Sequence, residues 1–357
     1  MIGEAMAKYK PDWKQAMERL TAWWKGEKID RVPAMITARR KGVLPRPLKK
    51  IVPDMYTNPE VVFYNLDATL EATYWAGEAF PNHWVYLGPV PLSGILGCQM
   101  HFEENTVWHC PCFQTLEEAE KISFQEENRW YRLLFSLTEQ SLRRSQGEYL
   151  VSGQGFGAAS DVMVDMWGAE KILLAMLEKP ETIKTILGKL TEISCFLYDR
   201  MDTLVRDYQP GSFDWLRLWA PGRVWTLQSD ISCMISPGLF QELILPELEK
   251  ETQHVDFAFY HLDGPGAIKH VETLVRIKTL ACIQWVPGAG ASCDPLDWLD
   301  LFRSIQSAGK KLLVSCPPER VKALLEKVDR RSICLAISCK EQEDAEKILL
   351  ELERIGG

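Results

Sequence analysis

The stretch FAFYHLDGPGAIKHVETLVRIKTLACIQWV, residues 257–286, decides the fold that this sequence predicts. An apolar run opens it, a segment typical of an amphipathic helix follows, and a second apolar run, TLACIQWV, closes it. Strands that alternate with helices indicate βαβ units and therefore a parallel sheet. Both runs are apolar throughout, as expected of strands whose two faces are covered by helices.

The same alternation extends in both directions along the chain. Further strands are predicted at 148–155, 214–220, 310–316 and 332–339, and helices at 169–201, 236–255, 294–309, 318–328 and 340–355. One more strand is predicted at Ile36, and another near 84–92 would complete a set for a barrel. An α/β fold of the (β/α)8 TIM-barrel type is the economical closure, and a doubly wound open sheet is the alternative. Such a barrel is commonly one domain of this length, here 1–357.

Residues 1–80 form a largely helical N-terminal extension in this interpretation. One helix is predicted to end near Gly26. A second helix is predicted to start after Asn58 as N-cap, with Pro59 at its first position, and to continue to residue 80. The segment 83–125 is rich in loop and strand signals, and we expect an elaboration of the barrel there.

Composition excludes several classes of function. The formal net charge of −8 favours neither nucleic acid nor an anionic membrane as partner, and no apolar run approaches the roughly 20 residues of a membrane span. The start of the chain carries no apolar signal segment, so the ten cysteines are expected to be free thiols in the cytoplasm. Thirteen tryptophans indicate an aromatic-lined pocket or interface and favour a homodimer.

Active-site residues of parallel barrels lie at the carboxyl ends of the strands, so side chains at those positions are the functional candidates. Those expected to contact a substrate are Gln154, Asp161, Trp219, Gln228, Gln284 and Trp285, with Asp230 in the same region. Those expected to bind a metal are His261 and Asp263, with Cys339 after the last strand and Cys316 as the alternative cysteine. Zinc takes His, Cys and carboxylate ligands and keeps one position open where it is catalytic.

Each metal candidate also has a structural explanation. His261 can be a hydrogen-bonded histidine in a pocket, and Asp263 can be the N-cap of the helix that begins at PGAIKHV. Cys339 and Cys316 can each be a small buried hydrophobic residue. His261 and Asp263 are two residues apart, so on a strand they share one face.

Several longer segments resemble one known family. These are WWKGEKIDRVP, GEAFPNHW with LGPV, DMWGAEKILLAMLEKPETIKTIL, LQSDISCMISPGLFQELILPELEK, YHLDGPGAIKHVETL, IQWVPGAG and ISCKEQEDAEKIL. Over most of its length the chain is similar to the uroporphyrinogen decarboxylase-like superfamily, which implies a distorted (β/α)8 barrel. True decarboxylases of this superfamily carry an Arg-rich MRQAGR-like motif that binds substrate carboxylates. Here the position reads MITARRKGVLPRP, with Arg39 and Arg40 but without the motif.

The corrinoid methyltransferase branch is the better match. Its zinc is held by a His-x-Cys pair on one strand and a late Cys. The corresponding residues here are His261 and Asp263, with Cys339 placed 78 residues after His261. Asp263 departs from the Cys of that branch, which makes the site harder and disfavours methylation of a thiol.

The resemblance therefore implies a zinc-dependent methyltransferase similar to the first methyltransferases of O-demethylase systems. Its substrate would be a small methylated compound, most plausibly an aromatic methyl ether. The methyl acceptor would be cob(I)alamin on a separate corrinoid protein, because this chain has no cobalamin-binding motif of its own. Asp230 or Tyr260 would orient or protonate the leaving oxygen. The alternatives are a uroporphyrinogen-type decarboxylase without metal and a methylcobalamin:thiol methyltransferase.

Overall fold

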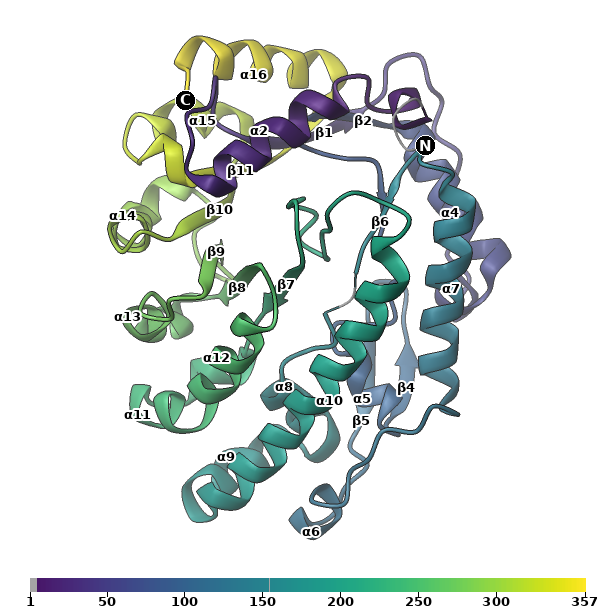
Figure 1. Ribbon diagram of the computed structural model, residues 1–357, viewed down its shortest axis with the longest axis vertical. Coiled ribbons are helices and arrows are strands. Elements are labelled where there is room, and N and C mark those ends of the chain that lie inside the picture. The colour runs from purple at the N-terminus through teal and green to yellow at the C-terminus, as the bar shows by residue number, and fades with distance from the viewer. Residues whose placement is uncertain (1–4, 154) are drawn as a thin grey trace.

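A seven-stranded sheet forms the centre of the computed structural model, which describes residues 5–153 and 155–357 (Figure 1). Its strand order is β2-β1-β11-β10-β9-β8-β7. The bounds are β1 Ala34–Arg39, β2 Thr73–Gly77, β7 Val224–Leu227, β8 Phe257–Asp263, β9 Leu280–Val286, β10 Lys311–Ser315 and β11 Ile333–Glu341. All neighbours in this sheet are parallel except β1 and β2, which are antiparallel. The predicted α/β fold with a parallel sheet is therefore confirmed.

Two short strands, β3 (Asn82–His83) and β6 (Leu150–Val151), form a separate parallel pair. Beyond β6, the N–H of Gly153 donates to the carbonyl of Phe213 at 3.0 Å. Hydrogen bonds between the described residues do not join the pair and the large sheet into one continuous ring, since β2 and β7 are the edges of the latter. A third sheet is the antiparallel hairpin of β4 (Gln99–Phe102) and β5 (Val107–Cys110).

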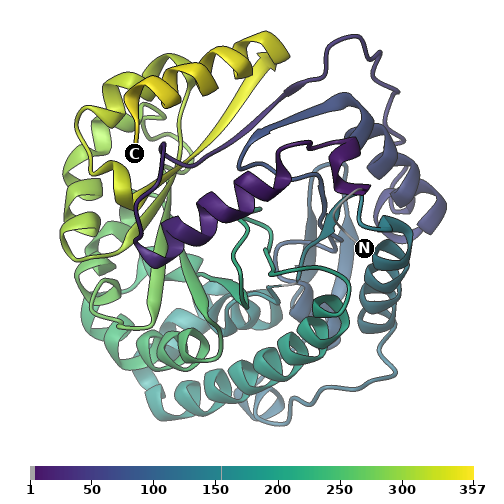
Figure 2. The same ribbon diagram turned by 45° about the horizontal axis from the view of Figure 1, so that its top comes forward.

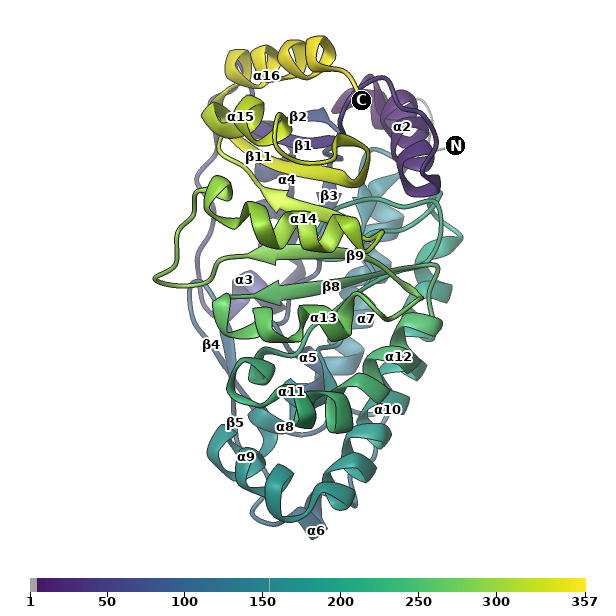
Figure 3. The same cartoon turned by 90° about the vertical axis from the view of Figure 1, so that its left-hand side faces the viewer.

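Helices surround these sheets (Figure 2). The longer ones are α2 Trp13–Lys25, α4 Pro59–Ala72, α7 Arg129–Ser145, α8 Ala159–Trp167, α9 Ala169–Glu178, α10 Pro180–Arg206, α12 Leu245–Gln253, α14 Leu299–Ser307 and α16 Gln342–Ile355. The shorter ones are α3 Asp54–Thr57, α5 Pro91–Ile95, α6 Leu116–Ala119, α11 Pro237–Leu239, α13 Val271–Leu274 and α15 Val321–Leu325. Figure 3 shows α13 and α14 lying against one face of β8 and β9, as the apolar strands predict. No helix in the described part of the chain is both long and apolar enough to span a membrane.

Helix α2 covers the amino-terminal end of the large sheet. Trp24 packs on Phe257 and Phe259 of β8, with ring centroids 5.0 and 5.2 Å apart. The helix ends at Gly26, whose φ of 70° is the left-handed conformation common at helix C-termini, so the predicted end is confirmed. With this end covered, the carboxyl ends of the strands are the open side of the sheet.

Several predicted elements differ from the structure, and no strand forms near 84–92, where β3 ends at His83 and α5 begins at Pro91. Asn58 caps α4 and accepts from the N–H of Glu60, as expected, but the helix ends at Ala72 and β2 follows in place of more helix. The predicted strand 214–220 forms only the isolated bridge between Ser212 and Ala220, and β7 comes later. The single helix predicted at 169–201 is two helices, because Pro180 interrupts it.

The predicted helix that starts after Ser236 exists but changes its winding. A π-helical turn, Phe240–Ile244, separates α11 from α12. Pro246 lacks an N–H and its ring would clash with a carbonyl of the preceding turn, so local widening of the helix relieves the conflict. The following turn carries Glu247 and Glu251 into the interior, where both are buried.

Candidate functional site

Three side chains converge at the carboxyl ends of β7 and β8. Asp230, His261 and Asp263 each offer one ligand atom, and these atoms lie within 4.8 Å of one another. His261 and Asp263 share one face of β8, as their spacing predicts. Asp230 is the first residue of a 3-10 turn, Asp230–Met234, that follows β7.

Gln284 of β9 fixes the orientation of His261. The Nδ1 of His261 lies 2.5 Å from Oε1 of Gln284, and the two residues are register partners in the parallel pair of β8 and β9. An amide oxygen can only accept, so Nδ1 is the donor in this contact, and in a neutral imidazole the other nitrogen, Nε2, then has the free lone pair. Histidines that bind metals usually donate their second ring N–H to such an acceptor.

Asp161 fixes the position of Asp230 through the backbone. Its carboxylate, in the first turn of α8, accepts from the N–H of Asp230 at 2.9 Å and from the N–H of Ile231 at 3.3 Å. Gln228 Nε2 lies 3.4 Å from both Asp161 Oδ2 and Asp230 Oδ2. Burial and the charge of Asp230 raise the pKa of Asp161 to about 7. Asp161 therefore holds the backbone of Asp230 in place.

The charges within the group oppose one another. Burial raises the pKa of Asp230, the nearby charge of Asp263 raises it further, and His261 acts in the opposite direction. Two carboxylates held this close repel each other, and a cation between them would relieve the repulsion. One imidazole nitrogen and two carboxylate oxygens, with no fourth ligand among the residues that the structure describes, are a donor set that suits a catalytic zinc ion. The residues present therefore fit the metal that the sequence predicts.

The structural alternative for Asp263 is not seen. The 3-10 helix after β8, Pro265–His270, has Gly264 as its N-cap residue, and no side chain caps it. A Cβ added to Gly288 would lie 3.3 Å from Oδ1 of Asp263, so the glycine leaves space beside that carboxylate. Asp263 is free of a capping role, and its carboxylate remains available to a ligand.

Cys339 does not join this group. Ser338 is exposed, whereas Cys339, the next residue of β11, is buried next to α16. There it lines a surface pocket with Asp344 and Ile348 of α16. The prediction that Cys339 completes the metal set is not matched by this geometry, and Asp230, expected to act as a catalytic acid, lies in that position instead.

Tyr260, Trp285 and Trp219, also predicted as site residues, lie outside the group of Asp230, His261 and Asp263. Tyr260 is 2% exposed and points to the face of β8 opposite His261, which separates it from a leaving group held there. Trp285 is buried and packs on Trp298 with centroids 4.8 Å apart. Trp219 is buried and donates its Nε1–H to the carbonyl of Pro210 at 2.8 Å. Gln154 lies outside the described residues.

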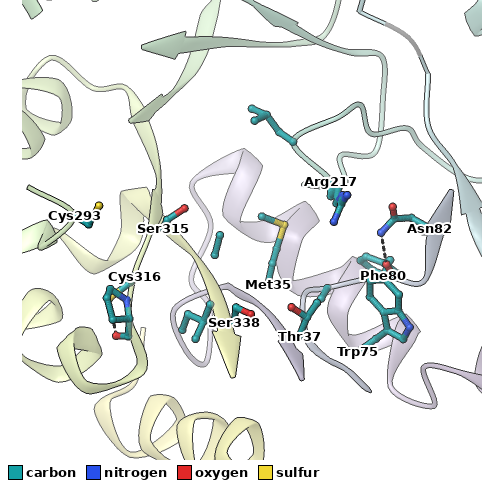
Figure 4. Close-up of a pocket in the computed structure, with 15 residues that line it drawn as sticks. Met35, Thr37, Trp75, Phe80, Asn82, Arg217, Cys293, Ser315, Cys316 and Ser338 are labelled. Atoms are coloured by element: carbon teal, nitrogen blue, oxygen red, sulfur yellow. Dashed lines mark hydrogen bonds between the residues drawn. The ribbon is translucent and has the colours of Figure 1, made fainter. Parts of the chain in front are cut away.

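A cavity of about 450 Å³ lies at the open end of the sheet (Figure 4). Its walls include the apolar Met35, Trp75 and Phe80, the polar Thr37, Asn82, Ser315 and Ser338, the cysteines Cys293 and Cys316, and Arg217. A second cavity of about 280 Å³ shares Cys293 and Ser315 with it and extends to Gly288 beside Asp263. The volume is within the usual range for small-molecule sites, about 300–1,000 Å³.

The loop between α10 and β7 contributes two residues that the sequence did not identify. Trp215 packs edge-on against His261, with centroids 5.0 Å apart, and Arg217 lines the large cavity. Both belong to the segment predicted as a strand. In a strand, residues 215 and 217 would share a face, but no pattern within the segment links either residue to His261.

No known protein-family profile matches this sequence, and no curated protein sequence is similar to it. A solved structure of a methyltransferase from Methanosarcina mazei is similar in fold, with a TM-score of 0.62. The match covers 95% of this chain and 98% of that chain at 16% sequence identity. At this identity the likeness establishes a shared fold over nearly the whole of both chains.

Proposed function

We propose that the protein is a zinc-dependent methyltransferase that moves the methyl group of an aromatic methyl ether to cob(I)alamin on a separate corrinoid protein. The observation that carries the proposal is the convergence of Asp230, His261 and Asp263 close to a cavity with aromatic walls. The likeness in fold to a methyltransferase supports the reaction class. The resemblance to the corrinoid methyltransferase branch supports the acceptor. In this proposal the seven-stranded sheet and the pair of β3 and β6 together form an interrupted (β/α)8 barrel.

Zinc held by these three residues would supply a Lewis acid that stabilises negative charge on the ether oxygen. The methyl carbon leaves that oxygen, which keeps the electron pair of the broken bond, and it bonds to the reactant cob(I)alamin through the electron pair of cobalt. The phenol oxygen then takes a proton from water. Gln284 and Asp161 hold His261 and Asp230 in place, so the ligands need little rearrangement during the reaction.

The donor set favours an ether over a thiol as substrate. No cysteine belongs to the group that the described residues form, and carboxylates make the site hard. The arginines near the first strand have partners within the protein. Arg39 pairs with Glu341 at 2.8 Å, and Arg40 donates to the carbonyl of Thr73 at 3.2 Å.

The corrinoid partner would dock beside the open end of the sheet. The segment 40–53 follows the carboxyl end of β1, where the cavity lies. It carries four exposed apolar side chains, Leu44, Leu48, Ile51 and Val52, of which Leu44 is 91% exposed. Exposed apolar residues that lie together commonly mark protein–protein contacts.

The test is elemental analysis of the purified protein and of single variants. We expect about one zinc per chain in the wild type, and at least tenfold lower occupancy in His261→Ala and Asp230→Ala. With a corrinoid protein and cob(I)alamin, methoxyaromatic compounds should yield the phenol and methylcobalamin, and both variants should lose at least about a hundredfold in rate.

Cys339→Ala is the matched control. It should keep its zinc, because Cys339 lies beside α16 and does not belong to the group of Asp230, His261 and Asp263. Loss of zinc in this variant would favour the ligand set predicted from the sequence over the one that the geometry assembles. A wild-type protein without metal, purified in the absence of chelators, would contradict the proposal. A decarboxylase that needs no metal would then be the remaining interpretation.

A further inference from the structure

Arg217 is held in an unusual backbone conformation above the cavity. Its φ is 63°, in the left-handed region that side chains other than glycine, asparagine and aspartate rarely adopt. Strained conformations of this kind persist only where the surroundings enforce them, and they concentrate at ligand sites.

The surroundings that enforce it centre on Asp214. The N–H of Arg217 donates to the carbonyl of Asp214 at 2.9 Å. The buried carboxylate of Asp214 accepts from the N–H of Leu216 at 3.0 Å and from the N–H of Thr226 at 2.5 Å. These hydrogen bonds fix the turn of residues 214–217 to strand β7. The backbone of Arg217 is therefore held in place beside the cavity.

The guanidinium of Arg217 has no partner among the described residues. It donates no hydrogen bond and forms no ion pair there, although it lines the cavity from the loop, with Asn82 close by in Figure 4. The other described residues that line this cavity are neutral. Burial alone shifts the pKa of Arg217, and the direction is downward, as expected of a cation that protein surrounds without a counter-charge.

We propose that Arg217 binds the carboxylate of the substrate and is the specificity-determining residue of the cavity. The planar guanidinium matches a carboxylate with two parallel hydrogen bonds. The wall formed by Met35, Trp75 and Phe80 would contact an aromatic ring. The ligand is therefore an aromatic acid, and its identification as the methyl donor rests on the proposed function.

The same turn connects this anion subsite with the metal group. Trp215, two residues before Arg217, packs on His261. A substrate whose carboxylate binds Arg217 would extend along this turn toward Asp230, His261 and Asp263. Its ether oxygen would then lie near the metal that these residues would hold. The cavity of about 450 Å³ suits a one-ring compound.

The experiment is a calorimetric titration of the chelator-treated protein with 4-methoxybenzoate and with 4-methoxybenzamide, its neutral analogue. We expect the wild type to bind the acid at least tenfold more tightly than the amide. Arg217→Gln should weaken binding of the acid at least tenfold and leave binding of the amide unchanged. Arg217→Lys should recover part of the loss, because it restores the charge without the planar fork. Arg143→Gln, at an exposed site on α7, is the matched control and should change neither.

Two results would overturn the proposal. One is a wild type that binds neither compound or does not distinguish them, and the other is an equal loss of both ligands in Arg217→Gln. Because the titration uses no metal and no corrinoid, it is independent of the proposed reaction. If the protein binds the acid but never binds zinc, the carboxylate subsite at Arg217 is supported and the proposed zinc-dependent methyl transfer is contradicted.

Discussion

Gln284 determines which nitrogen of His261 is available to a metal. The hydrogen bond from Nδ1 leaves the Nε2 lone pair free, and register pairing of β8 with β9 brings the two side chains together. An imidazole that could rotate would present either nitrogen and would lose freedom on binding. A single amide therefore preorganises the ligand before any ion arrives.

Removal of this amide should weaken metal binding without removing a ligand. In Gln284→Ala we expect zinc affinity to fall about 10- to 100-fold, as measured by competition with a chromogenic chelator. Gln284→Glu keeps the acceptor and should keep the affinity. Gln306→Ala, which removes a half-buried glutamine of α14 that contacts the backbone of Asp329 and not His261, should have no effect. An affinity unchanged in Gln284→Ala would show that His261 does not depend on this contact.

At the residue scale, the sequence predicted part of the group. The spacing of His261 and Asp263 at a strand end follows from the period of a strand and was sufficient to pair them. Asp230 comes from another element, and its place depends on Asp161 in α8, 69 residues earlier. Contacts between elements of this kind leave no local pattern, so Asp230 was predicted to act as a catalytic acid and Cys339 was predicted to be the third ligand.

At the scale of elements, the loop between α10 and β7 shapes the site. It closes on itself through the bridge between Ser212 and Ala220, and it presents Trp215 and Arg217 to the interior. Gly211 begins this loop with a φ of 65°. A Cβ there would lie 2.2 Å from the carbonyl oxygen of Ala220 and 2.7 Å from the ring of Trp219, so only glycine fits.

Gly211→Ala should therefore destabilise the loop and the fold together. We expect a loss of about 3 kcal/mol or more in the free energy of unfolding, from backbone strain and overlap, measured by urea titration. Gly42→Ala separates the two causes, because Gly42 has a φ of 75° but nothing within 4 Å of the added carbon. It should cost only about 1–2 kcal/mol. Equal losses would mean that the loop moves aside at little cost.

The same loop marks the limit of prediction for elements. Regular strands and helices with clear periodicity, such as β8, β9 and α16, were predicted from their own residues. The segment 214–220 is as apolar as a strand, yet the buried carboxylate of Asp214 accepts backbone N–H groups and turns the chain. A side chain that competes for backbone hydrogen bonds can override an apolar pattern.

At the scale of the whole molecule, the interior contains several buried carboxyl groups without enough nearby positive charge to balance them. Glu247 and Glu251 of α12 are buried, as is Asp161 of α8. Burial is the main cause that raises the pKa of Glu251 to about 8, and the charge of Asp161 adds to it. Burial and the charge of Glu251 raise the pKa of Glu247 as well. These acids are therefore more stable protonated in the folded protein than in the unfolded chain.

The sign of the pH dependence follows from these shifts. Between the unfolded pKa of Glu, about 4.3, and the folded value of about 8, the native state binds more protons than the unfolded state. Stability should therefore be complete below this window and fall as the pH rises through it. We expect the free energy of unfolding of the chelator-treated protein, from urea titration, to be lower at pH 9 than at pH 5.5.

Glu251→Gln tests the assignment, because an amide cannot ionise. Its loss of stability between pH 5.5 and pH 9 should be smaller than that of the wild type by about 1–3 kcal/mol. Glu353→Gln, at an exposed position of α16, should behave like the wild type. If Glu251→Gln and Glu353→Gln lose the same stability as the wild type, Glu251 is ionised at little cost. In that case water or a cation must reach the buried carboxylate of Glu251 and stabilise its charge, since the described residues do not.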